Sequence, residues 1–190
     1  GFQNPKEKHF ALRRLLARGT TTVEIKSGYG LSLDDELKTL RVARRAAEAA
    51  GLDAVLTCLA AHEIPDEYRD RRERYVALVC DEILPAVAEQ GLAERCDVFC
   101  EPSVFGLQET ETIVTRAREL GLRAALHADE LEPMGGAALA ARLGADSADH
   151  LIRIDRAGID ALAGADTVAT FLPGTVFSLS IRDYAPAREM

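Results

Sequence analysis

The sequence contains no tryptophan and only 5% aromatic residues, and it lacks any apolar run close to the ~20 residues that a membrane-spanning helix needs. Basic residues are also in the minority, because 23 Lys and Arg stand against 31 Asp and Glu, which gives a formal net charge of -8. Nucleic-acid binding normally requires a basic surface that neutralises phosphates. We therefore expect a small-molecule substrate as the partner, with no nucleic acid and no membrane.

A secretory signal begins with a positively charged segment that is followed by an apolar one, and residues 1–6 do not show this order. The four cysteines match neither a zinc ribbon nor a Cys-x-x-Cys redox pair, so we expect reduced thiols that are mostly buried, in a cytoplasmic protein; they are Cys58, Cys80, Cys96 and Cys100. The chain begins without Met, and Pro186 is suited to the first turn of a further helix. We expect the chain to be part of a longer protein, truncated at both ends.

The 190 residues are 47% hydrophobic, which is enough to bury a core, and no linker or low-complexity tract divides them. We therefore expect a single domain over residues 1–190. Six glycines, 20 to 40 residues apart, each end a helix-like stretch and precede a strand-like one; they are Gly19, Gly51, Gly91, Gly121, Gly144 and Gly164. This spacing is typical of strand–helix units of about 30 residues and predicts a parallel sheet.

The six predicted strands are short and mostly apolar, as in parallel strands that are covered on both faces; they cover residues 20–27, 53–60, 96–101, 122–128, 146–150 and 166–172. Helices are predicted between them, including residues 6–18 and 34–50, with Ser32 as the N-cap of the second. Six such units could form most of an open doubly wound sheet or three-quarters of an eight-stranded barrel.

Three familiar motifs are absent. The first strand–helix turn, Lys26-Ser27-Gly28-Tyr29-Gly30-Leu31, matches neither the dinucleotide fingerprint Gly-x-Gly-x-x-Gly nor the Walker sequence. The nucleophile elbow Gly-x-Ser-x-Gly of serine hydrolases does not occur either. Cys100, at a strand end, leaves a thiol nucleophile as an alternative, although a cysteine in that position is more often simply buried.

Three of the four histidines lie at the carboxyl end of a predicted strand; these are His62, His127 and His150, whereas His9 lies in a helix. The carboxyl ends of parallel strands form the ligand face of α/β folds, so the three imidazoles are expected to converge. A lone histidine there would more often be structural. Three together, with acidic neighbours, favour a functional site.

The segment His127-Ala128-Asp129-Glu130 carries the densest chemistry. Strand alternation allows His127 to point into a barrel mouth as a metal ligand, and Glu130, beyond the strand, can transfer protons near a metal-bound water. Asp129 has a plainer alternative as an acid at a helix N-terminus.

The next strand ends in Ala148-Asp149-His150. Alternation predicts that Asp149 points away from the mouth and orients a neighbour. His150 could ligate a metal or bind the nucleophilic water. His62 begins a loop, where it could recognise substrate or be simply exposed.

Seven segments, in order along nearly the whole chain, resemble the imidazolonepropionase family of the amidohydrolase superfamily: TTTVEIKSGYGL (20–31), AHEIP (61–65), DVFCE (97–101), HADE (127–130), ADHL (148–151), LPGT (172–175) and YAPAR (184–188). The resemblance implies an incomplete (β/α)8 TIM barrel, with six βα units that correspond to strands 2 to 7. It also implies metal-dependent hydrolysis of 4-imidazolone-5-propanoate to N-formimino-L-glutamate in histidine degradation, one divalent ion of zinc or iron, and a homodimer.

By the same resemblance, His127 is a metal ligand, Glu130 contacts substrate and assists attack, and His150 lies near the nucleophilic water. Tyr29 and His62 resemble substrate-binding residues, with His62 or His150 stabilising charge on oxygen. The His-x-His pair and the Asp-Phe-Asn-Pro-Gly segment that the family uses for its other ligands do not occur in these 190 residues. The loop that begins with Glu101 also departs from the family pattern.

One of four expected ligands is therefore present, and we expect the isolated chain to bind metal weakly and to be inactive. Two alternatives stay open: another metal-dependent cyclic amidohydrolase or heterocycle deaminase, and a non-catalytic scaffold.

Overall fold

A computed structural model describes residues 5–190 of the chain. Residues 1–4 lie outside the described residues, and with them most of the segment, residues 1–6, that does not show the order of a secretory signal. Six parallel strands form one sheet in the order of the sequence: β1 (Thr22–Lys26), β2 (Asp53–Ala61), β3 (Arg95–Cys100), β4 (Arg123–Ala128), β5 (Ser147–His150) and β6 (Val168–Thr170). All six predicted strands are thus confirmed.

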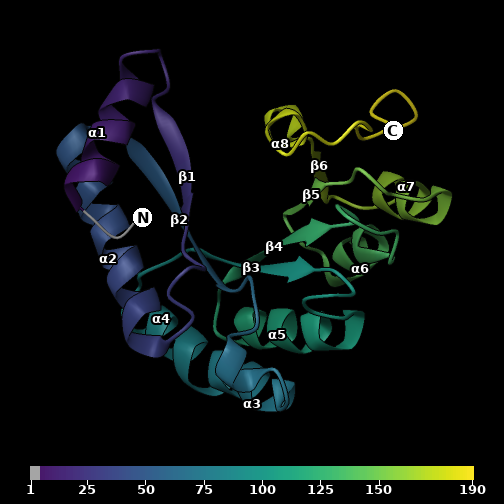
Figure 1. Cartoon of the computed structure of the whole chain (residues 1–190), viewed down its shortest axis with the longest axis horizontal. Coiled ribbons are helices and arrows are strands. Elements are labelled where there is room, and N and C mark those ends of the chain that lie inside the picture. Colours follow the sequence, from purple (N-terminus) through teal and green to yellow (C-terminus); the bar gives the residue numbers. More distant parts are fainter. Residues whose placement is uncertain (1–4) are drawn as a thin grey trace.

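The helices alternate with the strands and cover the convex side of the curled sheet (Figure 1). They are α1 (Pro5–Leu16), α2 (Leu33–Ala50), α3 (Arg72–Leu78), α4 (Leu84–Glu89), α5 (Leu107–Glu119), α6 (Gly136–Leu143), α7 (Arg156–Ala163) and α8 (Pro173–Ser178), with a 3-10 turn, η1 (Asp66–Tyr68), and a π-helical turn, η2 (Val79–Ile83). The sheet forms an open arc with β1 and β6 at its edges. This is the incomplete TIM-barrel-like α/β fold that the family resemblance implies, and the described residues do not form the open doubly wound sheet that the strand–helix pattern also allowed.

The predicted bounds are too long at both edges of the sheet. Residues 20–27 contain β1 over Thr22–Lys26 only, and residues 166–172 contain β6 over Val168–Thr170 only. Each edge strand pairs with a single neighbour, and the pairs that form define its length: β1 pairs with β2 from Thr22–Asp53 to Lys26–Thr57, and the pairing of β6 with β5 stops at Asp149 with Thr170.

Local sequence explains the ends of the longest helix. Ser32 accepts a hydrogen bond from the Asp35 amide and caps the start of α2, as predicted, and Gly51 ends it in the left-handed conformation at φ 73°. Between α3 and α4, the chain widens into the π-helical turn just before Pro85, whose ring nitrogen has no proton to donate.

The main hydrophobic core lies between the sheet and the helices that cover it. Its fully buried members include Leu40 of α2, Ile83 of η2, Ile113 of α5 and Leu126 of β4. The four cysteines are free and buried, as predicted. Within residues 5–190, none of the helices combines the length and the apolar character that crossing a membrane requires.

The opposite face of the sheet carries polar side chains. Phe99, His127 and Asp149 occupy matching positions on β3, β4 and β5, so their side chains leave the sheet on the same side. Asp97 lies one pleat earlier on that side of β3. The concave face therefore collects the charged residues that the apolar core excludes.

Candidate active site

His127 on β4 lies beside Asp97 on β3. Its Nδ1 is 3.1 Å from Oδ1 and 3.0 Å from Oδ2 of that completely buried carboxylate. Burial alone would raise the pKa of Asp97, but the charges and hydrogen bonds of His127 and Lys26 outweigh burial and hold the pKa well below its usual range. An ionised carboxylate only accepts, so His127 donates its Nδ1 proton and Nε2 is left as the second ring nitrogen.

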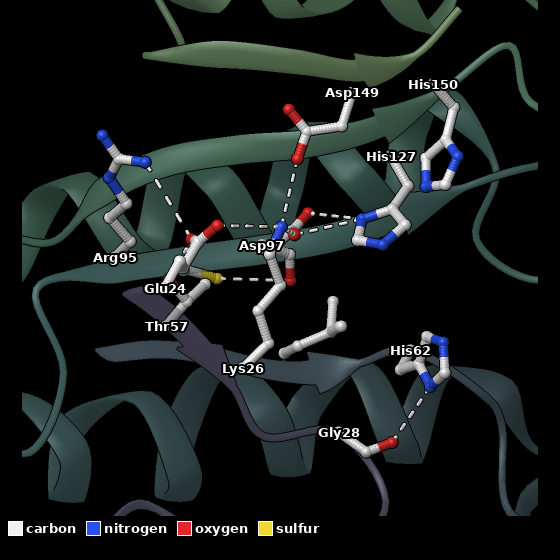
Figure 2. A network of polar contacts seen from close by, with 12 residues as sticks. Glu24, Lys26, Gly28, Thr57, His62, Arg95, Asp97, His127, Asp149 and His150 are labelled. Carbon is white, nitrogen blue, oxygen red and sulfur yellow. Dashed lines mark hydrogen bonds and ion pairs between the residues drawn. The ribbon is translucent and has the colours of Figure 1, made fainter. Parts of the chain in front are cut away.

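The Lys26 ammonium lies among three carboxylates at the centre of this concave face (Figure 2). Its Nζ is 2.6 Å from Asp97, 3.1 Å from Asp149 and 3.6 Å from Glu24. Burial alone would lower the pKa of Lys26, but the surrounding negative charges raise it above its usual value. Lys26 is therefore the resident cation of this cluster.

The prediction that Asp149 points away from the mouth was wrong. Asp149 pairs in register with His127, and its carboxylate contacts Lys26 across the concave face. The reason lies in the backbone of His150, which has a left-handed φ of 77°. Successive side chains alternate between the two faces of a strand only while the backbone is extended. The left-handed backbone at His150 ends that alternation, so Asp149 and His150 need not point to opposite faces.

His150 and Glu130 face one another beside His127. Glu130 Oε1 lies 3.2 Å from His150 Nδ1, and the ring centroids of His127 and His150 are 5.0 Å apart. Burial, followed by the positive charge of His127, lowers the pKa of His150 to about 4. Burial also raises the pKa of Glu130. Both shifts favour uncharged forms, so this pair can hold and pass a proton with little change in net charge.

His62 and Tyr29 lie on the other side of His127. The His62 ring centroid is 5.1 Å from Tyr29, 5.7 Å from Phe99 and 6.3 Å from His127. His62 Nδ1 is 3.1 Å from the Gly28 carbonyl oxygen (Figure 2). A carbonyl only accepts, so Nδ1 carries a proton.

Burial lowers the pKa of His62, which favours the neutral ring. Nε2 of the neutral ring is an acceptor. The sequence-based assignment of His62 as a donor to a developing oxyanion therefore does not fit the neutral ring, whereas an acceptor for a substrate N–H does.

Asp129 follows the plainer of its two alternatives. Its carboxylate accepts hydrogen bonds from the amides of Met134, Gly135, Gly136 and Ala137, at the start of α6. It therefore fixes the loop between β4 and α6. Cys100 does not fit a nucleophile, because burial raises its pKa to about 11 and the reactive thiolate is scarce.

All five residues predicted for the site, Tyr29, His62, His127, Glu130 and His150, gather at the carboxyl ends of the strands. Sequence reasoning missed Asp97, which contacts His127, and Lys26, which contacts Asp97. It also missed Glu101, whose carboxylate binds the amides of the Glu130 loop. The sequence did contain a signal for them: each is a charged residue within or directly after a short strand that also carries buried or partly buried apolar residues. Such a residue is buried only when it is paired.

The residues present fit a divalent metal ion. One nitrogen or oxygen atom from each of Asp97, His127 and Asp149 lies within 4.8 Å of the others, but Lys26 Nζ, 2.6 Å and 3.1 Å from the two carboxylates, already supplies a cation between them. Among the described residues, Asp149 Oδ1 is buried without a hydrogen-bond partner, and His150 Nδ1 approaches Glu130 to 3.2 Å without the alignment of a hydrogen bond. Because Lys26 already neutralises the carboxylates, His127 Nε2 is the better-placed ligand, and the Asp97–His127 pair is the arrangement that commonly orients a metal-binding imidazole.

Comparison with known proteins gives a consistent relationship. No family model matches the chain. It is 50% identical over 182 residues to an imidazolonepropionase of Porphyromonas gingivalis, which covers 96% of this chain and 43% of the relative. It is 54% identical over 180 residues to one of Symbiobacterium thermophilum, covering 94% and 42%. The chain is related to the imidazolonepropionases over nearly all of its length. It spans about two fifths of the length of these relatives.

Two solved structures share the fold. An adenine deaminase from Arthrobacter aurescens superimposes with a TM-score of 0.68 at 20% identity, over 97% of this chain and 57% of that protein. A D-hydantoinase gives a TM-score of 0.50 at 14% identity, over 93% and 45%. At these identities the likeness concerns the fold, and the relationship to the imidazolonepropionases rests on the sequence.

Proposed function

We propose that this chain is the central part of an imidazolonepropionase, a cytoplasmic enzyme that hydrolyses the cyclic amide of 4-imidazolone-5-propanoate to N-formimino-L-glutamate in histidine degradation. The observation that carries the proposal is about 50% identity to imidazolonepropionases over nearly the whole chain. The convergence of His62, His127, Glu130 and His150 supports it independently.

One divalent ion, zinc or iron, would be held by His127 Nε2 together with ligands from outside these 190 residues. When bound, such an ion supplies a nucleophile near neutral pH by lowering the pKa of a coordinated water. Asp97 would keep His127 in the tautomer that presents Nε2, and Lys26 would keep Asp97 ionised and in place.

The remaining residues would bind substrate and move protons. Tyr29 and His62 would line one side of the substrate, with neutral His62 accepting an N–H of the heterocycle. Glu130 contacts His150 and has a raised pKa, so it is suited to take up a proton and deliver it to the leaving ring nitrogen. His150 would hydrogen-bond the attacking water.

The test is turnover and metal content of the purified gene product that carries this chain. We expect N-formimino-L-glutamate by mass spectrometry, stoichiometric zinc or iron, and a loss of about 100-fold or more in kcat for Glu130→Gln. Glu132→Gln, an exposed acid in the same loop, is the matched control.

A panel with adenine and hydantoin separates the alternatives. Preference for one of these over imidazolone propanoate would replace the proposal with another cyclic amidohydrolase or deaminase. Absence of bound metal and of all turnover would favour a non-catalytic scaffold. The 190-residue chain alone is expected to show no turnover, and light scattering of the gene product tests the proposed homodimer.

A further inference from the structure

Two loops at the carboxyl end of the sheet each fold around a buried carboxylate of the chain itself. Glu36, in the first turn of α2, is completely buried. It accepts hydrogen bonds from the amides of Gly28 at 3.0 Å, Gly30 at 2.9 Å and Leu31 at 3.0 Å. The glycine-rich loop after β1, which carries Tyr29, therefore has its amides directed at an internal anion.

The glycines permit this arrangement. A Cβ on Gly28 would lie 2.5 Å from the Leu59 carbonyl oxygen, and one on Gly30 would lie 2.6 Å from Asp35 Cβ. Gly28 also has a φ of 100°, in the left-handed region. The sequence Ser27-Gly28-Tyr29-Gly30 thus lets the backbone close around Glu36, and no phosphate is needed to explain it.

Glu101, directly after β3, does the same for the loop after β4. It is completely buried, and its carboxylate accepts hydrogen bonds from three consecutive amides. The distances are 2.7 Å to Glu130, 3.0 Å to Leu131 and 3.2 Å to Glu132. Hydrogen bonds to an ionised acceptor are about twice as strong as neutral ones. Glu101 thus binds the backbone of the residue whose side chain faces His150.

We propose that Glu101 is a positioning residue that holds the Glu130 loop so that the Glu130 carboxylate faces His150, and that Glu36 holds the Tyr29 loop in the same way. The two anchors lie on different elements and bind different loops. Their effects on turnover rest on the proposed function, whereas their effects on loop order do not.

The two loops should affect different kinetic constants, and this difference distinguishes positioning from a merely structural role. A displaced Glu130 loop impairs proton transfer, so it lowers kcat; misplacement by about 1 Å can cost roughly 100-fold. A displaced Tyr29 loop weakens substrate binding and raises KM. General destabilisation would instead lower the melting temperature without such a split.

The experiment compares Glu101→Gln and Glu36→Gln in the gene product, with Glu132→Gln as control. Hydrogen–deuterium exchange is followed over residues 129–133 and 27–32, and kcat, KM and melting temperature are measured in parallel. We expect Glu101→Gln to speed exchange in the first segment by about tenfold and to lower kcat with little change in KM. Glu36→Gln should speed exchange in the second segment and raise KM.

Equal exchange in variant and wild type, or the same kcat and KM changes in both variants, would overturn the proposal. Altered exchange without any turnover of imidazolone propanoate by the wild type would leave the anchoring in place and remove the proposed function. If Glu101→Gln does not fold, the wild type still decides: amides 130–132 must exchange far more slowly than the amide of the exposed residue Ser103, two positions after Glu101, and equal rates would refute the anchor.

Discussion

Lys26 Nζ lies 2.6 Å from Asp97 Oδ2, and the same carboxylate accepts the Nδ1 proton of His127. These residues come from β1, β3 and β4, so a single chain of contacts crosses the concave face of the sheet. Asp149 adds a second carboxylate to Lys26 at 3.1 Å. The site therefore rests on a buried, charge-balanced network whose centre is a lysine.

Removal of that lysine should be costly. Lys26→Met keeps the length of the side chain but leaves buried Asp97 and Asp149 without their cation, which we expect to lower the free energy of unfolding by about 3 kcal/mol. Urea denaturation measures the loss. Lys38→Met is the control, because the exposed Lys38–Asp35 pair at 3.7 Å should contribute less than about 1 kcal/mol. If Lys26→Met lowers the free energy of unfolding no more than Lys38→Met does, the Lys26 network does not stabilise the fold.

Asp97→Asn should weaken metal binding while preserving shape. The amide is a poorer acceptor for His127 Nδ1, so the imidazole loses its fixed tautomer, and we expect metal affinity of the gene product to fall by about 10- to 100-fold. Isothermal titration with zinc gives the affinity, and ¹⁵N shifts of His127 in the metal-free protein give the tautomer. Asp53→Asn, at an exposed position that begins β2, should leave both unchanged. Unaltered binding in Asp97→Asn would contradict the role of the pair.

The sequence allowed the six strands and the convergence of three histidines to be predicted, because parallel strands bring all their carboxyl ends to one edge. The phase of β5 could not be predicted. All four of its residues are buried, so no contrast between polar and apolar positions indicates which side faces inward. The left-handed backbone at His150 and Leu151 then interrupts the alternation on which the prediction relied.

The partners of the buried charged side chains could not be predicted from the sequence either. Glu36 belongs with Asp34 and Asp35 to the acidic first turn of α2, yet its carboxylate turns back to Gly28, Gly30 and Leu31. Contacts between residues as distant as Lys26 and Asp149 depend on strand register. Register is a property of the assembled sheet and is not encoded in either segment alone.

The thiols should resist alkylation in the folded state. Burial raises the pKa of Cys58 to about 12 and that of Cys80 and Cys100 to about 11. At pH 8 a thiol with a pKa near 11 is about 0.1% thiolate, and iodoacetamide reacts with the thiolate. Peptide mapping after treatment at pH 8 should show little modification of these four cysteines in the native protein and complete modification of all four in guanidinium. Selective alkylation of Cys100 in the folded protein would instead support Cys100 as a nucleophile.

His62 offers a test in which two substitutions should separate two roles. An asparagine amide can reach the place of Nδ1 and still donate to the Gly28 carbonyl, whereas a glutamine amide reaches nearer to Nε2, which faces the substrate in our proposal. His62→Gln should therefore lose about 1 kcal/mol of stability with the Gly28 hydrogen bond, while His62→Asn should raise KM more. Urea denaturation and steady-state kinetics give the two rankings. We expect His62→Gln to be the less stable variant and His62→Asn to have the higher KM, because one ring nitrogen holds the loop and the other contacts the ligand. If the same variant shows both the greater loss of stability and the higher KM, His62 acts through a single contact.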